Sequence, residues 1–526
     1  MESIGQLTSD MRKQKGAVAA GHPLSAETAE AILRDGGNAF DAAVGAQFTA
    51  LVAEPVLTSL GGGGFLFAEN TNSKQFVYDF FVQTPMQKAD TGTLDFFPIQ
   101  ADFGGAEQEF RIGAGSVATP GMVKGLFKVH RDLCSLPLKR LAGPAIEFAR
   151  RGVKMNSFQS SIFDIVRPIY DSSEQASEIF GSRTSSGELI REGEVLQQPE
   201  MANLLEVLVK EGEQLFYEGE IAKSAVSVTH TPGGHLTLKD FRRYKVERRA
   251  PLSLRYKSQE IALNPTPATG GMLISFALKL LESAGDDVPG FGSANYIAQL
   301  AEIQRLTDSA RIESLANNGT DGINHLLDET GLKLYREQIS DRLKSFRGTT
   351  QISVADGEGN RASLTSSNGE GSGVMIPGTG IMLNNMLGEA DLNPGGFHGW
   401  EPNRRVSSMM SPGILKMENG TDVVFGSGGS NRIRTAILQL LLNLIDHNMS
   451  IAEAVNAPRL HFEDGKLNVE SGFDLDVFRE LKQLYPNQKI WNKKSLYFGG
   501  AHSVSVRNGT YSGAGDVRRG GASIVF

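Results

Sequence analysis

The middle of the chain alternates apolar and polar residues with the period of an α-helix. Apolar side chains recur every three or four positions there, with polar residues between them. Two further helices are expected near the start: one that Ser25 caps and Gly36-Gly37 end, and an alanine-rich one at 41–52. The four amphipathic helices predicted in the middle are at residues 122–133, 138–150, 272–284 and 294–315.

Short apolar runs that suit β-strands lie towards both ends of the chain. Several flank turn sequences such as Asp356-Gly357, Asn419-Gly420 and Asn508-Gly509, which predict hairpins. A long helix is expected at 433–456, and no repeat or flexible linker interrupts the chain. We therefore expect one domain of mixed α and β structure whose halves meet near Gly348. The expected strands are at residues 17–20, 65–68, 76–81, 351–355, 361–365, 414–417, 422–425 and 522–526.

Composition and charge indicate an ordinary globular protein and argue against some partners. The chain has 526 residues, 40% hydrophobic and 21% charged, as in ordinary globular proteins. Its net charge of -8 gives no electrostatic reason to bind DNA or RNA, so nucleic acid is not an expected partner. Residues 1–15 lack the apolar core of a signal peptide, and the most apolar later stretch, 436–445, is too short to span a bilayer. We therefore expect a cytoplasmic protein with no membrane partner.

Several kinds of site have little support. Cys134 is the only cysteine, so no intrachain disulfide can form, and the scattered histidines lack metal-ligand spacing, so no metal site is expected. The tract Gly426-Ser427-Gly428-Gly429-Ser430 does not match the Gly-x-Ser-x-Gly pattern of serine hydrolases, because its third residue is Gly and its last is Ser. The four glycines at 61–64 lack the lysine of a phosphate-binding loop.

One tract is a candidate for nucleophilic chemistry. Gly348-Thr349-Thr350 stands immediately before an expected strand, which on its own is typical of β-propensity. Its surroundings change the interpretation, because motifs along nearly the whole chain resemble the γ-glutamyltranspeptidase family. These motifs follow in family order and include Ala-Gly-His-Pro at 20–23, Gly-Gly-Asn-Ala-Phe-Asp at 36–41, Ser-Val-Ala-Thr-Pro-Gly at 116–121, Ser-Ser-Met at 407–409 and Ala-Pro-Arg at 457–459.

The resemblance implies a self-cleaving N-terminal-nucleophile hydrolase with a four-layered αββα fold and no cofactor. The precursor would cut itself between Gly348 and Thr349 into fragments 1–348 and 349–526, which stay together as a heterodimer. Thr349 would be the nucleophile and its freed α-amine the base. An α-amine has a pKa of about 7.7 to 8.0, so it is partly neutral near physiological pH.

The same resemblance implies three helpers for Thr349. Ser367 stands at the position of a second hydroxyl residue that assists the nucleophile. The backbone N–H groups of Gly428 and Gly429 would stabilise the oxyanion, since glycine leaves room for a close approach. Thr350 is interpreted as part of the strand rather than of the chemistry.

The substrate-binding positions depart from the family pattern. Where γ-glutamyl enzymes hold the substrate α-carboxylate with an arginine, this chain has Phe81, which should weaken carboxylate binding. Ser407 and Ser408, which contact that carboxylate in the family, are kept. Glu389 replaces the aspartate that binds the substrate ammonium.

Smaller departures lie nearby. Met386 replaces a polar residue, and Gln351 stands where histidine is frequent. Gly369 takes a position usually held by asparagine, for which the adjacent Asn368 could compensate. The segment from 389 to 407 is also shorter than the lid-bearing segment of well-known transpeptidases, so an open site is expected.

Three functions remain open at this point. The first is a γ-glutamyl hydrolase or transferase in which Arg404, Arg405 or Arg432 replaces the missing arginine. The second is an enzyme for another small-molecule amide, as in the oxamate-amidohydrolase and cephalosporin-acylase relatives, which Phe81 favours. The third is an uncleaved, inactive scaffold, against which the intact Gly348-Thr349 tract argues.

Overall fold

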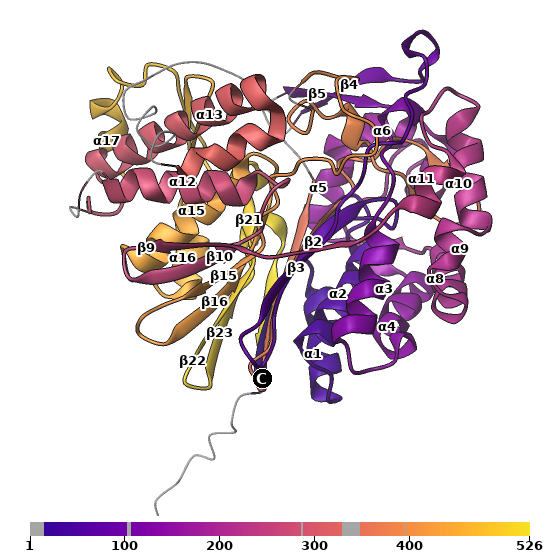
Figure 1. The fold of residues 1–526 in the computed structure, drawn as a ribbon, viewed down its shortest axis with the longest axis horizontal. Coiled ribbons are helices and arrows are strands. Elements are labelled where there is room, and N and C mark those ends of the chain that lie inside the picture. Colours follow the sequence, from indigo (N-terminus) through magenta and orange to yellow (C-terminus); the bar gives the residue numbers. More distant parts are fainter. Residues whose placement is uncertain (1–14, 103–106, 284, 286–287, 329–347, 394) are drawn as a thin grey trace, which may run out of the picture.

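Two antiparallel sheets occupy the centre of the protein (Figure 1). The computed structural model describes residues 15–102, 107–283, 285, 288–328, 348–393 and 395–526. The first sheet has seven strands in the order β24 (Ala522–Val525), β1 (Gly16–Ala20), β11 (Thr350–Asp356), β12 (Arg361–Ser367), β2 (Gly63–Glu69), β3 (Gln75–Phe80) and β8 (Glu247–Arg249). The second has six, in the order β23 (Thr510–Ala514), β22 (Ser503–Arg507), β16 (Thr421–Phe425), β15 (Gly413–Lys416), β10 (Gln259–Leu263) and β9 (Leu252–Tyr256).

Strand β1 shows how the sheets are covered. Its side chains alternate, as the pleat of a strand requires. Val18 and Ala20 belong to a core shared with helices, whereas Ala17 and Ala19 pack against Val504 and other residues of the second sheet. The helices of the first core include α1 (Pro23–Arg34), α2 (Ala39–Ala53), α3 (Met122–Leu133), α4 (Leu138–Arg151) and α8 (Pro199–Glu211).

Another group of helices packs with the second sheet in the largest core. Figure 1 shows the two sheets between this group and the α1–α4 group. The helices of this group are α12 (Gly270–Ser283), α13 (Ala294–Gly322), α15 (Arg432–Ile445) and α16 (Ile451–Asn456). No helix among the described residues is both long enough and apolar enough to cross a membrane.

Smaller elements surround these layers. The remaining helices are α5 (Ser157–Ile165), α6 (Arg167–Asp171), α7 (Glu174–Phe180), α9 (Gln214–Tyr217), α10 (Glu220–His230), α11 (Leu238–Arg243) and α17 (Leu475–Glu480). The remaining strands form sheets of two or three: β4 (Phe97–Asp102), β5 (Glu107–Ile112), β6 (Val153–Lys154), β7 (Val195–Leu196), β13 (Met375–Ile376), β14 (Ile381–Met382), β17 (Ser427–Gly428), β21 (Gly500–Ala501), β18 (Leu460–Glu463), β19 (Lys466–Val469) and β20 (Gln488–Ile490).

The expected mixture of helices and strands is confirmed, with local corrections. The long helix expected at 433–456 is wrong, because α15 ends at Ile445 and Asn448 adopts a left-handed φ of 50° before α16 begins. Helix α1 is capped by His22 rather than Ser25, and α13 continues to Gly322. Residues 1–14, the polar start considered above, lie outside the described residues.

Candidate active site

The predicted cleavage point lies at the start of a central strand. Thr350 of β11 is opposite Ser366 of β12, so Thr349 and Ser367 come together one residue further along. The hydroxyl groups of Thr349 and Ser367 both donate to the carbonyl oxygen of Gly348, each over 2.7 Å. Only 3% of Thr349 and 4% of Ser367 are exposed. Two buried hydroxyls therefore converge on the carbonyl oxygen of the bond that would break.

The backbone on both sides of this bond is held by side chains from distant parts of the sequence. The N–H of Gly348 donates to Oε1 of Glu370. The carbonyl oxygen of Thr349 accepts from Nη1 of Arg519 over 3.2 Å. The two contacts fix the peptide groups that flank the Gly348-Thr349 bond.

The two glycines predicted to stabilise the oxyanion lie beside Thr349. A Cβ at Gly428 would come within 2.2 Å of the Thr349 carbonyl oxygen, so only glycine permits this approach. Gly429 follows with a φ of 126°, a conformation that also favours glycine. The next residue, Ser430, lines the pocket beside Thr349.

A buried acid lies beneath the nucleophile tract. The hydroxyl of Thr350 contacts both carboxyl oxygens of Glu54 at 3.1 Å. Burial raises the pKa of Glu54 to about 8, although the Thr350 hydrogen bond and the charge of Arg519 oppose the shift. Burial likewise lowers the pKa of Arg519 to about 10, against the attraction of Glu370 and other acids. The Thr350 hydroxyl is therefore engaged within the core, as a strand-entry residue would be.

A small pocket opens beside Thr349 and Ser367. In the uncut chain its volume is about 20 Å³, enough for about one water molecule. Three of the predicted substrate-binding residues line it, namely Phe81, Glu389 and Ser408. The rest of its lining is Met386, Asp391, Leu392, Met409, Met410, Ser430 and Ile433.

Other predicted residues lie outside this pocket. Ser407 faces a neighbouring cleft. The side-chain amide of Asn368 donates to the carbonyl of Met382 over 3.3 Å, so it is turned away from the place where a compensating amide was expected. Gln351 bonds to the hydroxyls of Ser353 and Ser363, within the sheet.

The aromatic residue at the arginine position is part of the core. Phe81 is 1% exposed and stacks on Phe65, with 5.5 Å between ring centroids. The guanidinium of Arg405 lies behind Phe81, where it donates to the Phe81 carbonyl and to the hydroxyl of Tyr244, and it pairs with Asp79 at 3.2 Å. Arg405 is thus committed to the backbone behind the pocket.

The other two candidate arginines are also engaged elsewhere. Arg432 is buried and pairs with Glu463 at 3.2 Å, and Arg404 pairs with Glu401 at the surface. No arginine or lysine is found among the described residues that line the pocket at Thr349. These positions therefore do not supply a replacement for the missing guanidinium in the uncut chain.

Gly369 and Glu389 fit each other. A Cβ at Gly369 would lie 2.1 Å from Oε1 of Glu389 and 2.1 Å from Oδ1 of Asn385. The φ of Gly369 is 67°, which also favours glycine. The two departures from the family pattern are therefore linked, because the small residue leaves room for the longer acid.

Sequence reasoning missed several residues of the site. Asp391 adds a second acid to the pocket, and its Oδ2 accepts from the hydroxyl of Ser430 over 3.0 Å. Asp391 follows Glu389 by two residues, and this proximity could have predicted that both acids lie at the site. Glu370 and Arg519 gave none, because their contacts depend on how distant segments meet.

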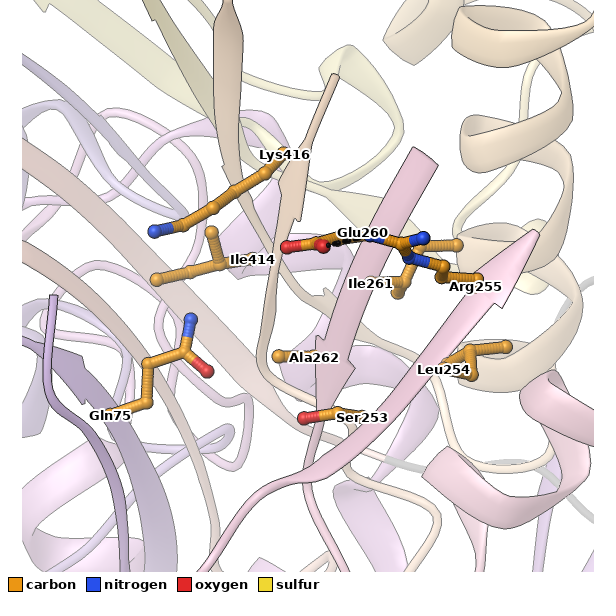
Figure 2. Close-up of a pocket in the computed structure, with 9 residues that line it drawn as sticks. All are labelled: Gln75, Ser253, Leu254, Arg255, Glu260, Ile261, Ala262, Ile414 and Lys416. Atoms are coloured by element: carbon orange, nitrogen blue, oxygen red, sulfur yellow. Dashed lines mark hydrogen bonds and ion pairs between the residues drawn. The ribbon is translucent and has the colours of Figure 1, made fainter. Parts of the chain in front are cut away.

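A separate cavity of about 320 Å³ shares no lining residue with the pocket at Thr349. Figure 2 shows Lys416 and Gln75 facing into it. Both side chains already bind Glu69, at 2.8 and 2.6 Å. It is therefore not part of the candidate active site. Its lining is Gln75, Ser253, Leu254, Arg255, Glu260, Ile261, Ala262, Ile414 and Lys416.

Sequence comparison decides the family. The sequence profile described as Gamma-glutamyltranspeptidase matches residues 25–526. The chain belongs to the γ-glutamyltranspeptidase family. It is 29% identical to the glutathione hydrolase proenzyme of Escherichia coli (strain K12), over 97% of this chain and 91% of that protein. It is equally similar, at 29%, to the Acylase ACY 1 proenzyme of Pseudomonas sp. (strain V22), over 97% and 94%.

A solved structure shares the fold of this family member. The cephalosporin acylase from Bacillus halodurans superposes with a TM-score of 0.81, over 100% of this chain and 99% of that one, at 22% identity. The chain is thus an amidohydrolase or transferase of the N-terminal-nucleophile type, and the relatives compared by sequence are proenzymes. Among the described residues, no group of three or more His, Cys, Asp or Glu side chains could hold a metal ion.

Proposed function

We propose that this chain cuts itself before Thr349 and then uses Thr349 to cleave a small-molecule amide through an acyl-enzyme. The observation that carries the proposal is the convergence of the Thr349 and Ser367 hydroxyls on the Gly348 carbonyl oxygen, both at 2.7 Å. An inactive scaffold would have no need of this buried arrangement.

The first reaction breaks the Gly348-Thr349 bond. The Thr349 oxygen attacks the Gly348 carbonyl carbon, and the carbonyl oxygen becomes an oxyanion to which Ser367 donates. The C–N bond then breaks, the Thr349 nitrogen takes up the proton that the Thr349 hydroxyl loses, and an ester links the two fragments. Water hydrolyses this ester, which frees the Gly348 carboxylate, the Thr349 hydroxyl and the Thr349 α-amine.

The second reaction reuses the same atoms on a substrate. The α-amine accepts the proton of the Thr349 hydroxyl as its oxygen attacks the amide carbon. Backbone N–H groups of Gly428 and Gly429 stabilise the oxyanion, and the leaving amine takes the proton as the acyl-enzyme forms. Water or an acceptor amine then removes the acyl group, which gives hydrolysis or transfer.

The fold supports a stable product of cleavage. We assign the two sheets and their outer helices to the four-layered αββα arrangement. Strands β11 and β12 come from fragment 349–526, yet they lie between β1 and β2 of fragment 1–348 in one sheet. The fragments are therefore expected to remain a heterodimer, because separation would break four strand pairings: β24–β1, β1–β11, β12–β2 and β15–β10.

The pocket favours an acyl group that carries a positive charge. Glu389 and Asp391 line it, so an ammonium such as that of a γ-glutamyl group is a suitable ligand. Phe81 stands at the position of the arginine whose guanidinium would pair with an α-carboxylate. A related amide without that carboxylate is consequently the second candidate, and the names of the acylase relatives agree with it.

Turnover of a substrate panel tests the proposal. The cut protein is offered γ-glutamyl-p-nitroanilide, other aminoacyl p-nitroanilides and acyl-lactams, and the mass of the 349–526 fragment is followed for an added acyl group. The proposal predicts acylation of this fragment in the wild type and none in Thr349→Ala. Turnover that persists in Thr349→Ala would refute the role of Thr349.

A single substitution tests the acyl group. Phe81→Arg restores the guanidinium that γ-glutamyl enzymes carry at this position. A γ-glutamyl activity that rises in Phe81→Arg identifies Phe81 as the residue that sets specificity. A wild type that already releases p-nitroaniline rapidly from the γ-glutamyl compound would show that the arginine is dispensable here.

A further inference from the structure

A wide cleft of about 910 Å³ adjoins the pocket at Thr349. Leu392 lines both spaces, and Ser407 faces the cleft while the next residue, Ser408, faces the pocket. The two spaces therefore share a wall. A substrate whose amide lies at Thr349 has this cleft beside it.

Basic side chains outnumber acidic ones in the lining of the cleft. Arg249 and Arg405 both pair with the buried Asp79, at 2.8 and 3.2 Å. Even with Asp79 included, the basic groups outnumber the acids, so the cleft carries an excess of positive charge. The charged residues of the lining are Arg243, Lys245, Arg249, Arg404 and Arg405, with Glu247 and Glu401 as the acids.

Two of these basic groups are available to a ligand. Arg243 ends α11 and Lys245 follows two residues later, and both side chains are exposed. Neither forms an ion pair with any residue in the described ranges. Arg404, in contrast, is paired with Glu401 at 3.0 Å. Arg243 and Lys245 can therefore bind an anion without breaking an existing contact.

The pocket and the cleft have opposite charge. Glu389 and Asp391 line the pocket and would repel a carboxylate placed there. The cleft offers positive charge, and Trp400 and Pro267 add apolar surface for a carbon chain. A substrate that is anionic at one end would find its complement only in the cleft.

We propose that this cleft binds a carboxylate of the amide substrate, held by Arg243 and Lys245 while the amide lies at Thr349. The inference rests on the proposed function, since it assumes an amide substrate. The carboxylate can belong to the tail of the acyl group or to the leaving amine. The chemistry of recognition is the same for both, and the experiment below separates them.

Equilibrium binding tests the cleft without catalysis. Adipate is titrated into the cut protein, and binding is followed by calorimetry and by tryptophan fluorescence, to which Trp400 in the cleft lining and Trp491 both contribute. We expect saturable binding. The double variant Arg243→Glu/Lys245→Glu should weaken it by about tenfold or more, because both charges near the bound anion change from attractive to repulsive. Arg242→Glu is the matched control, because Arg242 is exposed on the same helix but does not line the cleft. It should leave the affinity unchanged.

Kinetics with four substrates then locate the carboxylate. Adipyl and hexanoyl amides are each made with p-nitroaniline and with a carboxylated nitroaniline as the leaving group. The double variant should lower kcat/KM about tenfold or more only for substrates whose carboxylate reaches the cleft. A selective loss with the adipyl compounds assigns the cleft to the acyl tail, and a selective loss with the carboxylated leaving group assigns it to the amine.

Two results would overturn the inference. One is the absence of saturable adipate binding, and the other is an equal loss of affinity in the double variant and in Arg242→Glu. A chain that turns over neither these four substrates nor any amide of the panel used to test the proposed function contradicts that function instead, and the adipate titration still decides whether the cleft binds a carboxylate.

Discussion

Two neighbouring parts of the candidate site are built in different ways. Around the Gly348-Thr349 bond, the decisive contacts involve backbone atoms: the Gly348 carbonyl accepts two hydroxyls, and the Gly348 N–H donates to Glu370. Elsewhere the pocket is lined by side chains such as Phe81 and Glu389. The first part keeps the residues that the family resemblance predicts at 349 and 367, whereas Phe81 and Glu389 depart from that pattern.

The difference shows which positions are free to change. A side chain at Gly428 would strike the Thr349 carbonyl, so the backbone around the nucleophile allows few substitutions. Phe81 packs on Phe65 and leaves the strands that carry Thr349 in place. We therefore expect that the pocket wall can be rebuilt for another acyl group without loss of the proposed reaction.

Thr349→Ala should have the largest effect. It removes the hydroxyl that attacks the Gly348 carbonyl, so both self-cleavage and amide turnover are expected to be undetectable. A denaturing gel and a p-nitroaniline assay measure the two losses. Thr350→Ser is the matched control, because it keeps the hydroxyl that contacts Glu54, and it should still be cut.

Ser367→Ala should come next. It removes one donor to the carbonyl oxygen that becomes the oxyanion, so the rate of self-cleavage should fall by about 10²–10³. A time course of fragment formation after refolding measures the rate. Ser366→Ala serves as the control, since its hydroxyl bonds to Gln47 and not to Gly348. Equal rates in the two variants would exclude Ser367 from the cleavage step.

Gly369→Ala should disturb the pocket wall more than the nucleophile. The added Cβ would meet Glu389 and Asn385, so kcat/KM for an ammonium-bearing amide should fall about tenfold, while self-cleavage continues. Gly378→Ala is the matched control: its φ of 68° is nearly the same, but nothing lies within 4 Å of the added Cβ. Both variants share a backbone cost of about 1–3 kcal/mol, which urea unfolding measures.

A paired substitution sharpens that test. Gly369→Asn combined with Glu389→Asp restores the pair typical of the family and shortens the acid that the new side chain would meet. The double variant should recover most of the activity lost in Gly369→Asn alone. Losses that simply add would show that the two positions are independent.

Glu54→Gln should have the smallest effect on activity, because it acts on the pH dependence of stability. The pKa of Glu54 is about 8 in the folded chain and 4.5 for an ordinary glutamate, so the folded state binds the extra proton between these values. Stability should therefore fall as pH rises from about 4.5 to 8, by up to roughly 1.4 kcal/mol per pH unit. Glu54→Gln should remove this part of the slope in urea unfolding, and the exposed Glu358→Gln should not. An unchanged slope in Glu54→Gln would contradict the shift.

The local elements of this structure could be predicted from the sequence. Alternation and turn residues placed most strands, because side-chain period and turn chemistry are local properties. The break between α15 and α16 was also readable, since Ser450 and Glu453 form a capping box at the start of α16. Apolar residues recur at helical spacing on both sides of the break, so the two helices were predicted as one.

Contacts between distant segments could not be predicted in this way. Arg519 reaches the Thr349 carbonyl from the far end of the chain, and Arg405 turns away from the pocket to bind Asp79. The fit between Gly369 and Glu389 depends on a loop approach that no local pattern encodes. The position of the proposed nucleophile at the start of a strand was therefore predictable, and the charge of the pocket and of its neighbouring cleft was not.

Intact-mass analysis of the purified wild-type protein, with N-terminal sequencing of the smaller product, tests the central claim most directly. Self-cleavage at the Gly348-Thr349 bond predicts two chains, residues 1–348 and 349–526, with Thr349 as the first residue of the second. A single uncut chain of 526 residues, or a small fragment that begins at any other residue, would contradict it.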